Sequence, residues 1–349
     1  MNFGSDNQTG ASPQVLEAIM KANDGFLHGY GDEDYTRQTV EQLKRLFDCD
    51  LEAYFIPTGT AANCLALSSL VNPWQTILCH PEAHIIQDEN TAPELLTGGA
   101  RLKAIATEQP KIHLEDLKKV LSYQAKEAPH NSLAGAMSLT QCTELGQAYQ
   151  PEEVKQLCLL AHQHGLSVHM DGARFSNAVA HLGCHPKEIS WQAGVDVLCL
   201  GATKNGALAA EAVIFFNKEL AVDFEQRRKR AGHLLSKGRL FSAQFQGWLE
   251  NDHWLELATH ANRMAEMMAK GLSEKPGCRI IFPVEANELF VTLPKSTTER
   301  LQQHGAEFYE WPTSGLAEHL QPSEGEQMIR LVTSFITKEH EVKQFCDLI

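Results

Sequence analysis

Apolar residues follow two alternating patterns up to about residue 245 of the chain. Short apolar runs bounded by Gly, Pro or polar residues predict buried strands over 53–56, 76–79, 136–140, 166–170 and 195–200. Segments with apolar positions at helical spacing predict helices over 60–71, 113–121 and 151–165. Strands that alternate with helices predict an α/β fold with a largely parallel sheet.

The pattern changes after about residue 245. It predicts a long amphipathic helix over 254–270, strands over 288–293 and 330–335, a short helix over 296–304 and a charged C-terminal helix. We therefore expect a large α/β domain over 21–245 and a smaller α+β domain over 246–349, preceded by an N-terminal segment over 1–20.

Composition narrows the class of protein without indicating its chemistry. The chain has 349 residues, of which 43% are hydrophobic and 21% charged, as is typical of a soluble globular protein with a large core. Its formal net charge of −14 argues against binding to nucleic acid or to an anionic membrane surface. Nine cysteines without CxxC spacing favour a reducing compartment, and no signal-peptide or membrane-span pattern is visible, so we expect a cytoplasmic protein.

A candidate phosphate site follows the first predicted strand. Ligands in open α/β sheets bind at the carboxyl ends of strands, so residues at these ends are the first candidates for chemistry. The sequence over 57–63 reads PTGTAAN, which puts Gly59 and Thr60 where the strand turns into a helix. Backbone N–H groups at a helix N-terminus bind phosphate, although an ordinary turn with a capping threonine fits the same pattern.

Two ionisable residues follow later strands. Asp171 ends one apolar strand, where a carboxylate is costly to bury unless it pairs with a cationic ligand nitrogen or with Arg174. A metal site on His169 and Asp171 has no third ligand at a supporting spacing, so we predict no metal. Lys204 follows the strand over 195–200 among small residues. A desolvated lysine there can act as an amine nucleophile, and a capping or snorkelling lysine is the alternative.

Three further residues lie at predicted strand ends. His84 follows a strand and a proline, where its ring can face a ligand, and Arg174 and Arg330 can bind a carboxylate in a fork. The whole set comprises a phosphate cradle, an acid for a cationic ring nitrogen, and a lysine 33 residues after that acid. This combination is what pyridoxal phosphate requires.

With these motifs in place, nearly the whole chain resembles the low-specificity L-threonine aldolases, which are fold type I pyridoxal-phosphate enzymes. The matching motifs are SDN at 5–7, YGD at 30–32, PTGTAAN at 57–63, EAH at 82–84, HMDGARFSNA at 169–178, TKNG at 203–206 and RLVT at 330–333. The resemblance implies a large cofactor domain with a mostly parallel seven-stranded sheet, a small C-terminal domain, and an N-terminal segment that reaches the active site.

The resemblance also implies a role for each matching residue. Lys204 holds the cofactor as a Schiff base, with Thr203 beside it, and Asp171 pairs with the pyridinium nitrogen. The other implied contacts are Gly59 and Thr60 to the phosphate, His84 stacked on the ring near the substrate hydroxyl, and Ser5, Arg174 and Arg330 to the substrate carboxylate. A basic residue of a partner subunit reaches the phosphate in this family, and Arg239, with Lys237 as second choice, is our candidate.

The sequence departs from the family pattern in two places. Thr203 precedes the lysine where many relatives have serine, which keeps a hydroxyl. The stretch over 140–144 reads TQCTE, without the second active-site histidine of some relatives. This second departure puts in doubt any mechanism that depends on two histidines.

The expected activity is cleavage of L-threonine and L-allo-threonine to glycine and acetaldehyde by a homo-oligomer, a dimer of dimers with shared active sites. His84, directly or through a water, is the candidate base for the β-hydroxyl proton. Another fold type I reaction, such as β-elimination or transamination, fits the same lysine and aspartate. A non-catalytic binding or assembly protein that has kept the fold is the alternative from another class.

Overall fold

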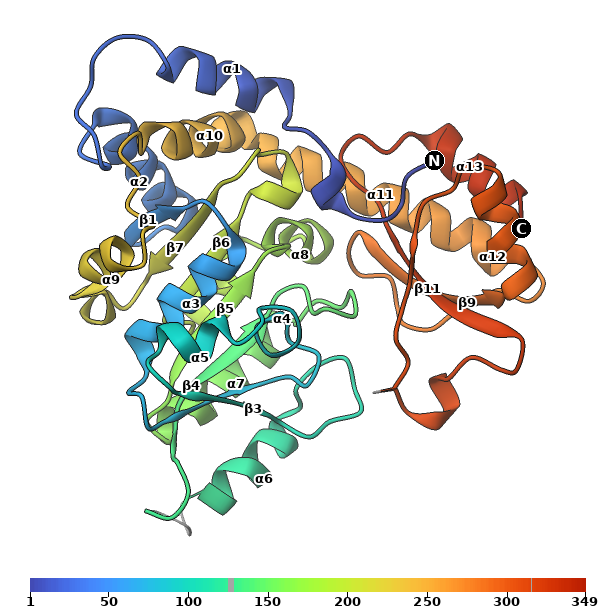
Figure 1. The fold of residues 1–349 in the computed structure, drawn as a ribbon, viewed down its shortest axis with the longest axis horizontal. Coiled ribbons are helices and arrows are strands. Elements are labelled where there is room, and N and C mark those ends of the chain that lie inside the picture. The colour runs from blue at the N-terminus through green and yellow to red at the C-terminus, as the bar shows by residue number, and fades with distance from the viewer. Residues whose placement is uncertain (125–128, 315) are drawn as a thin grey trace.

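Two β-sheets organise the computed structural model, which describes residues 1–124, 129–314 and 316–349 (Figure 1). The larger sheet has seven strands in the order β1-β7-β6-β5-β4-β2-β3. Only β7 runs antiparallel to its neighbours. The strands are β1 Glu52–Ile56, β2 Thr76–Cys79, β3 Arg101–Ala104, β4 Ala134–Thr140, β5 Ser167–Gly172, β6 Val197–Gly201 and β7 Glu211–Phe215. The expected mostly parallel seven-stranded sheet is therefore confirmed.

Helices cover both faces of this sheet, which explains why its central strands read as continuous apolar runs. Leu198 and Leu200 of β6 join one buried cluster, and Val197 and Cys199 join the other, because consecutive side chains of a strand point to opposite faces. One face carries α1 Pro13–Ala22, α2 Asp34–Phe47, α6 Leu114–Gln124, α7 Pro151–Gln163, α8 Phe175–Leu182 and α10 Arg239–Leu249. The other carries α3 Gly59–Leu70, α4 His84–Gln87, α5 Ala92–Leu96 and α9 Phe224–Arg230.

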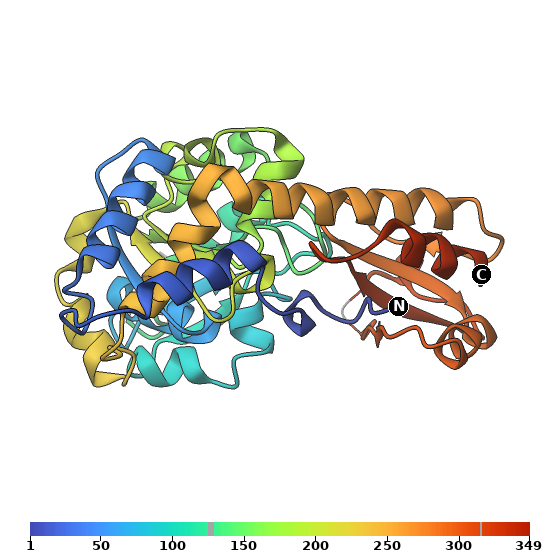
Figure 2. The same cartoon turned by 90° about the horizontal axis from the view of Figure 1, so that it is seen from above.

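The smaller sheet is antiparallel and follows the order β10-β11-β9-β8. Its strands are β8 Arg279–Ile280, β9 Glu288–Pro294, β10 Tyr309–Glu310 and β11 Glu326–Val332, and it packs with α12 Lys295–Gln303 and α13 Glu339–Asp347. The long helix α11, His253–Ser273, joins the two units (Figure 2). Trp254 and Leu257 belong to the core of the large sheet, whereas Met268 and Leu272 belong to the core of the small one.

The N-terminal segment is anchored to the small sheet. The ring of Phe3 packs edge-on against Phe345 at 5.2 Å, and its carbonyl accepts a hydrogen bond from the Val332 backbone N–H. Farther along, the Ser12 backbone N–H donates to the carbonyl of Gly206, beside Lys204. Residues 4–11 therefore cross between the two units close to the predicted active site.

Two features of the structure relate to the expected reducing compartment and to the lack of a membrane-span pattern in the sequence. All nine cysteines are free thiols in the structure. Among the described residues, the helices are all too short or too polar to pass through a bilayer.

Candidate active site

A cavity of about 390 Å³ lies at the carboxyl ends of β4, β5 and β6, next to the N-terminus of α3. Of the residues predicted from the sequence, it is lined by Gly59, Thr60, His84, Asp171, Arg174, Thr203 and Lys204. The structure thus brings together side chains that are up to 145 positions apart in the sequence, from 59 to 204.

Asp171 is buried on the cavity wall without a cationic partner. Its Oδ2 accepts a hydrogen bond from Nδ2 of Asn63 at 2.8 Å, and its Oδ1 accepts from the Ala173 backbone N–H at 2.9 Å. The alternative pairing with Arg174 is not found, since no ion pair of Asp171 occurs among the described residues. A buried carboxylate is stabilised by a positive partner, so this one fits a cationic nitrogen of a bound ligand.

His84 is held by a second buried acid. Its Nδ1 lies 2.9 Å from Oε1 of Glu89, which also accepts from Nδ2 of Asn63 at 2.9 Å. Because the carboxylate only accepts hydrogen bonds, Nδ1 carries the proton and Nε2 is the ring atom available to a ligand. The hydrogen bond with Glu89 raises the pKa of His84 above its ordinary value.

Asp171, His84 and Glu89 also form a cluster with metal-ligand chemistry that sequence spacing did not reveal. One ligand atom from each lies within 4.8 Å of the others. The Asn63 amide donates a hydrogen bond to each of the two carboxylates of this cluster. His169, the other residue considered as a ligand, uses its ring nitrogens in contacts with Ser138 and Cys199.

Lys204 lies on a short, well-anchored turn after β6, the 3₁₀ helix Thr203–Asn205. Nδ2 of Asn205 donates to the carbonyl of Trp254 at 2.7 Å, and Nε1 of Trp248 donates to the carbonyl of Asn205 at 2.8 Å. In the part of the chain that the structure describes, no hydrogen bond or ion pair of the half-buried Lys204 ammonium is found. The turn therefore presents an unpaired amine to the cavity, as a nucleophilic lysine requires.

Thr203 uses its hydroxyl within the protein. It donates to Oε1 of Glu211 at 2.5 Å and accepts from the Ala210 backbone N–H at 3.1 Å. Burial raises the pKa of Glu211 to about 7, while the hydrogen bond from Thr203 and the charge of Lys204 oppose this shift. Thr203 therefore fixes a carboxyl group next to the lysine.

The N-terminus of α3 forms the end of the cavity that was predicted to bind phosphate. Thr58 caps the helix by accepting a hydrogen bond from the Ala61 backbone N–H, so the capping interpretation is correct for Thr58. The N–H groups of Gly59 and Thr60, the first two residues of the helix, have no intrahelical partner. Gly59 has open space where a Cβ would stand. The free donors and the open space together fit a phosphate group.

Two buried acids hold the predicted carboxylate-binding arginines. Asp6 accepts from Nε and Nη2 of Arg174 at 2.8 and 3.0 Å. Glu288 lies 3.1 Å from Nη1 of Arg174 and 3.8 Å from Nη1 of Arg330, which stacks on Trp311 at 4.8 Å. Burial acts to raise the pKa of Asp6, but the charges of Arg174 and Lys204 outweigh it and lower that pKa.

The remaining predicted residues lie outside the cavity lining. The Ser5 hydroxyl caps a 3₁₀ turn by accepting from the Asn7 backbone N–H, and Asn7 lines the cavity instead. Arg330 shares Glu288 with Arg174, and Arg239 contacts the backbone carbonyls of residues 24 and 25 in its own chain. Lys237 is exposed on the preceding turn. The roles assigned to these four residues stay predictions.

With this geometry established, comparisons with known proteins identify the family. The family model for beta-eliminating lyases matches residues 2–296. The chain belongs to the beta-eliminating lyase family. A low specificity L-threonine aldolase from Pseudomonas sp. (strain NCIMB 10558) is 41% identical over 98% of this chain and 95% of that protein. One from Pseudomonas aeruginosa is 42% identical over 88% of each.

The fold comparison leads to the same relatives. A solved structure of threonine aldolase from Leishmania major matches with a TM-score of 0.91 at 26% identity, over 99% of this chain and 98% of that one. The resemblance inferred from the motifs and the fold type I architecture are therefore confirmed for this beta-eliminating lyase.

Sequence reasoning missed several cavity residues of this beta-eliminating lyase. Asn63 belongs to the PTGTAAN motif and lines the cavity from α3, but the motif alone does not indicate a role for it. Glu144 was noted only as part of a stretch that lacks a histidine, although it lines the cavity. Glu211 lies at the start of β7, whose register places it opposite Gly201 at the end of β6. For Glu144, a carboxylate shortly after the predicted strand over 136–140 was the available signal.

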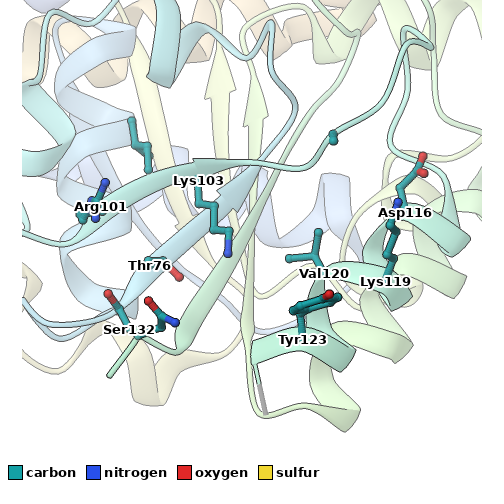
Figure 3. Close-up of a pocket in the computed structure, with 11 residues that line it drawn as sticks. Thr76, Arg101, Lys103, Asp116, Lys119, Val120, Tyr123 and Ser132 are labelled. Atoms are coloured by element: carbon teal, nitrogen blue, oxygen red, sulfur yellow. The ribbon is translucent and has the colours of Figure 1, made fainter. Parts of the chain in front are cut away.

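A second cavity, of about 460 Å³, lies away from the predicted site residues (Figure 3). It is bounded by β3 and α6, and Lys103 reaches from β3 toward the space beside Tyr123. The side chains of Arg101, Lys103 and Lys119 that line it are exposed. None of the predicted site residues lines this second cavity.

Proposed function

We propose that this protein is a pyridoxal-phosphate-dependent aldehyde-lyase that cleaves L-threonine and L-allo-threonine to glycine and acetaldehyde. The observation that carries the proposal is a single cavity that combines a buried unpaired carboxylate, an unpaired lysine and a helix N-terminus with free N–H groups. The names of the curated relatives, low-specificity L-threonine aldolases, support the same substrate class.

The residues present fit pyridoxal phosphate on the chemistry of their donors. Lys204 would hold it covalently, Asp171 would keep its ring nitrogen protonated, and Gly59 and Thr60 would bind its phosphate. Asn63 would fix the Asp171 carboxylate in position. The bound cofactor supplies the electron sink for the electron pair left at the substrate Cα.

The chain's other residues would position the substrate. His84 would face the cofactor ring and the β-hydroxyl, since its Nε2 side is available and its Nδ1 side is held by Glu89. Arg174, with Ser5 and Arg330, would bind the substrate carboxylate. Fixing the carboxylate sets the direction of the Cα–Cβ bond, and orientation of this kind lowers a barrier by roughly 7–11 kcal/mol at best.

We also propose a cytoplasmic homo-oligomer, a dimer of dimers in which active sites are shared. The free thiols support a reducing compartment. Among the described residues of one chain, the cationic side chains on the cavity wall are Arg174, which is already paired, and Lys204, with His84 as a titratable third. A phosphate dianion is better held by a further cation, which a partner's Arg239, or Lys237, would supply. This arrangement is tested by measuring the cofactor affinity of the Arg239→Ala variant and its oligomeric state by sedimentation.

The activity is tested by mixing purified protein and cofactor with L-threonine, L-allo-threonine and D-threonine. We expect a visible absorption band from the bound cofactor, and acetaldehyde and glycine in equal amounts from the two L-substrates only. Parallel assays with an α-keto acid detect transamination, and serine tests β-elimination. A protein that binds the cofactor but releases no acetaldehyde would refute the proposal.

A further inference from the structure

Glu144 stands on the cavity wall beside two groups of the proposed site. It lies just beyond β4, whose last residue, Thr140, pairs in register with Asp171 on β5. Its carboxylate Oε1 accepts hydrogen bonds from the Thr140 hydroxyl at 2.7 Å and from the His84 backbone N–H at 2.8 Å. Glu144 is therefore fixed between the acid for the cofactor ring and the predicted ring-facing histidine.

The loop that carries Glu144 is internally bonded and buried. The Gln141 side chain donates to the Tyr149 carbonyl and accepts from the Tyr149 backbone N–H, both at 2.9 Å. Within the loop, the Gln147 carbonyl accepts from the Thr143 backbone N–H at 2.8 Å, and Gly146 adopts a positive φ that favours glycine. These contacts hold the carboxyl group in one place, as proton transfer at hydrogen-bond distance requires.

Two other residues donate hydrogen bonds to the Glu144 carboxylate. Both donors are neutral and both reach Oε1, and no cationic partner of Glu144 occurs among the described residues. Burial raises the pKa of Glu144 to about 7, and the negative charge of Asp171 adds to the shift, while hydrogen bonds from Thr140, from the His84 backbone and from its own backbone oppose it. The ionisable groups around it are Asp171, His84, Cys79 and Tyr149. A general base works best with a pKa near the working pH.

The other acids in and next to the cavity already have partners or an assigned role. Glu89 bonds His84 and Asn63, and Asp171 is the partner for the cofactor nitrogen. Glu211 has an equally raised pKa, but it bonds Thr203 and lies next to Lys204. His84 is a weaker base candidate than its position suggests, because pairing with Glu89 favours its charged form.

We propose that Glu144 is the acid–base group that takes up the β-hydroxyl proton of the substrate, an inference that rests on the proposed aldolase function. The O–H bond breaks as its proton moves to the Glu144 carboxylate, and its electrons form the C=O bond of acetaldehyde. The Cα–Cβ electrons stay at Cα, which then takes one proton to give glycine. Glu144 releases its proton to solvent, so the protons balance.

The test separates this proton transfer from the rest of the site. Glu144→Gln keeps the side-chain shape, so we expect cofactor binding, the visible spectrum and the exchange of the glycine α-proton in D₂O to stay within about twofold of wild type. Cleavage of L-threonine falls by about 10²–10⁴-fold, the usual contribution of a general base. Glu285→Gln is the matched control, because Glu285 accepts from the Ala148 backbone N–H of the same loop outside the cavity lining. We expect it to be near wild type in both reactions.

The pH dependence of the rate tests whether Glu144 acts as a base, and an infrared titration provides a second measurement that does not depend on activity. A base works when deprotonated, so wild-type kcat/KM should fall as pH drops below about 7, the pKa to which burial raises Glu144, and this limb should vanish in Glu144→Gln. Glu144→Asp should restore part of the rate together with the limb. Infrared titration of the cofactor-free protein should show two carboxyls protonating near neutral pH, those of Glu144 and Glu211. One of the two signals should be missing in Glu144→Gln, and both should be present in Glu285→Gln.

Three results would overturn the proposal. Equal loss of cleavage and glycine exchange in Glu144→Gln would make the residue structural, and unchanged cleavage would remove it from the mechanism. An unchanged acidic limb would assign the proton to another group, and His84→Asn would then identify it. If the proposed aldolase function itself is wrong, the wild type will show it: it would exchange the glycine proton but cleave no β-hydroxy amino acid.

Discussion

The two cavities differ in how their polar groups are held rather than in size. The one beside β3 is slightly larger, at about 460 against 390 Å³, and it has three basic side chains. Those side chains are exposed and free to move in water. The cavity at the ends of β4, β5 and β6 contains buried carboxyl groups that other side chains and backbone N–H groups hold in place. Polar groups fixed away from water stabilise a developing charge without reorganising, so burial and hydrogen bonding identify the functional cavity.

The position in the sheet explains this difference. β5 and β6 are central strands covered on both faces, so the residues at their ends are buried by the chain segments around them. β3 is the edge strand, and three of its four residues are exposed. A basic side chain on an edge strand also discourages pairing with other chains, which accounts for Lys103 without any ligand.

The largest expected effect is from Lys204→Ala. Removing the amine should abolish the visible absorption band of the covalently held cofactor and reduce threonine cleavage by on the order of 10⁴-fold or more. Absorption spectra and acetaldehyde release measure both. A persistent band would show that another lysine holds the cofactor.

A smaller loss is expected from Asp171→Asn, which keeps the shape of the side chain and removes its charge. Without the anion the ring nitrogen loses its proton, and we expect a drop of about 10²–10³-fold in kcat, the scale of losing one fixed electrostatic contact. Asn63→Ala, which removes a hydrogen bond to the same carboxylate, should cost less. A larger loss of kcat in Asn63→Ala than in Asp171→Asn would contradict this prediction.

Glu288→Gln should act on stability and on substrate binding together. Glu288 is almost fully buried between Arg174 and Arg330, and breaking a buried ion pair leaves an uncompensated charge. We expect a free energy of unfolding lower by about 3 kcal/mol, which urea titration measures. The KM for threonine should rise more than kcat falls, and an unchanged KM would remove the arginine pair from the substrate site.

The smallest effect is expected from Lys103→Ala in the second cavity. An exposed substitution away from buried contacts changes stability by less than about 0.5 kcal/mol, and it should leave cleavage and cofactor affinity unchanged. A clear loss of cofactor affinity, measured by spectral titration, would show that the edge-strand cavity is coupled to the site.

The sequence could reveal the parts of the site that depend on local pattern. Asp171 and Lys204 stand at or shortly after the ends of short, mostly apolar runs, and Gly59 and Thr60 stand at a strand-to-helix turn, so these three points could be placed before the fold was known. The strand over 76–79 matches β2 residue for residue.

What sequence could not reveal depends on contacts between distant segments. The alternative pairing of Asp171 with Arg174 considered only local neighbours, but Arg174 bonds Asp6, 168 positions away. Glu144 gains its role because its loop folds back onto His84. β3 is an edge strand and therefore lacks an apolar run that the sequence could show. β11 begins at Glu326, but its first residues are only half-buried, so the apolar pattern predicted a start at 330.

The anchoring of Phe3 has a consequence for the order of assembly during synthesis. Residues 3–6 are synthesised before Glu307 and Val332, whose backbone groups bind Phe3 only after most of the described chain has been made. Asp6 therefore meets Arg174 long after the large sheet can form, and the segment that completes the site waits unattached. In a nascent chain halted before residue 307, the turn that carries Lys204 could already be formed, whereas Arg174 would still lack its ion pair with Asp6.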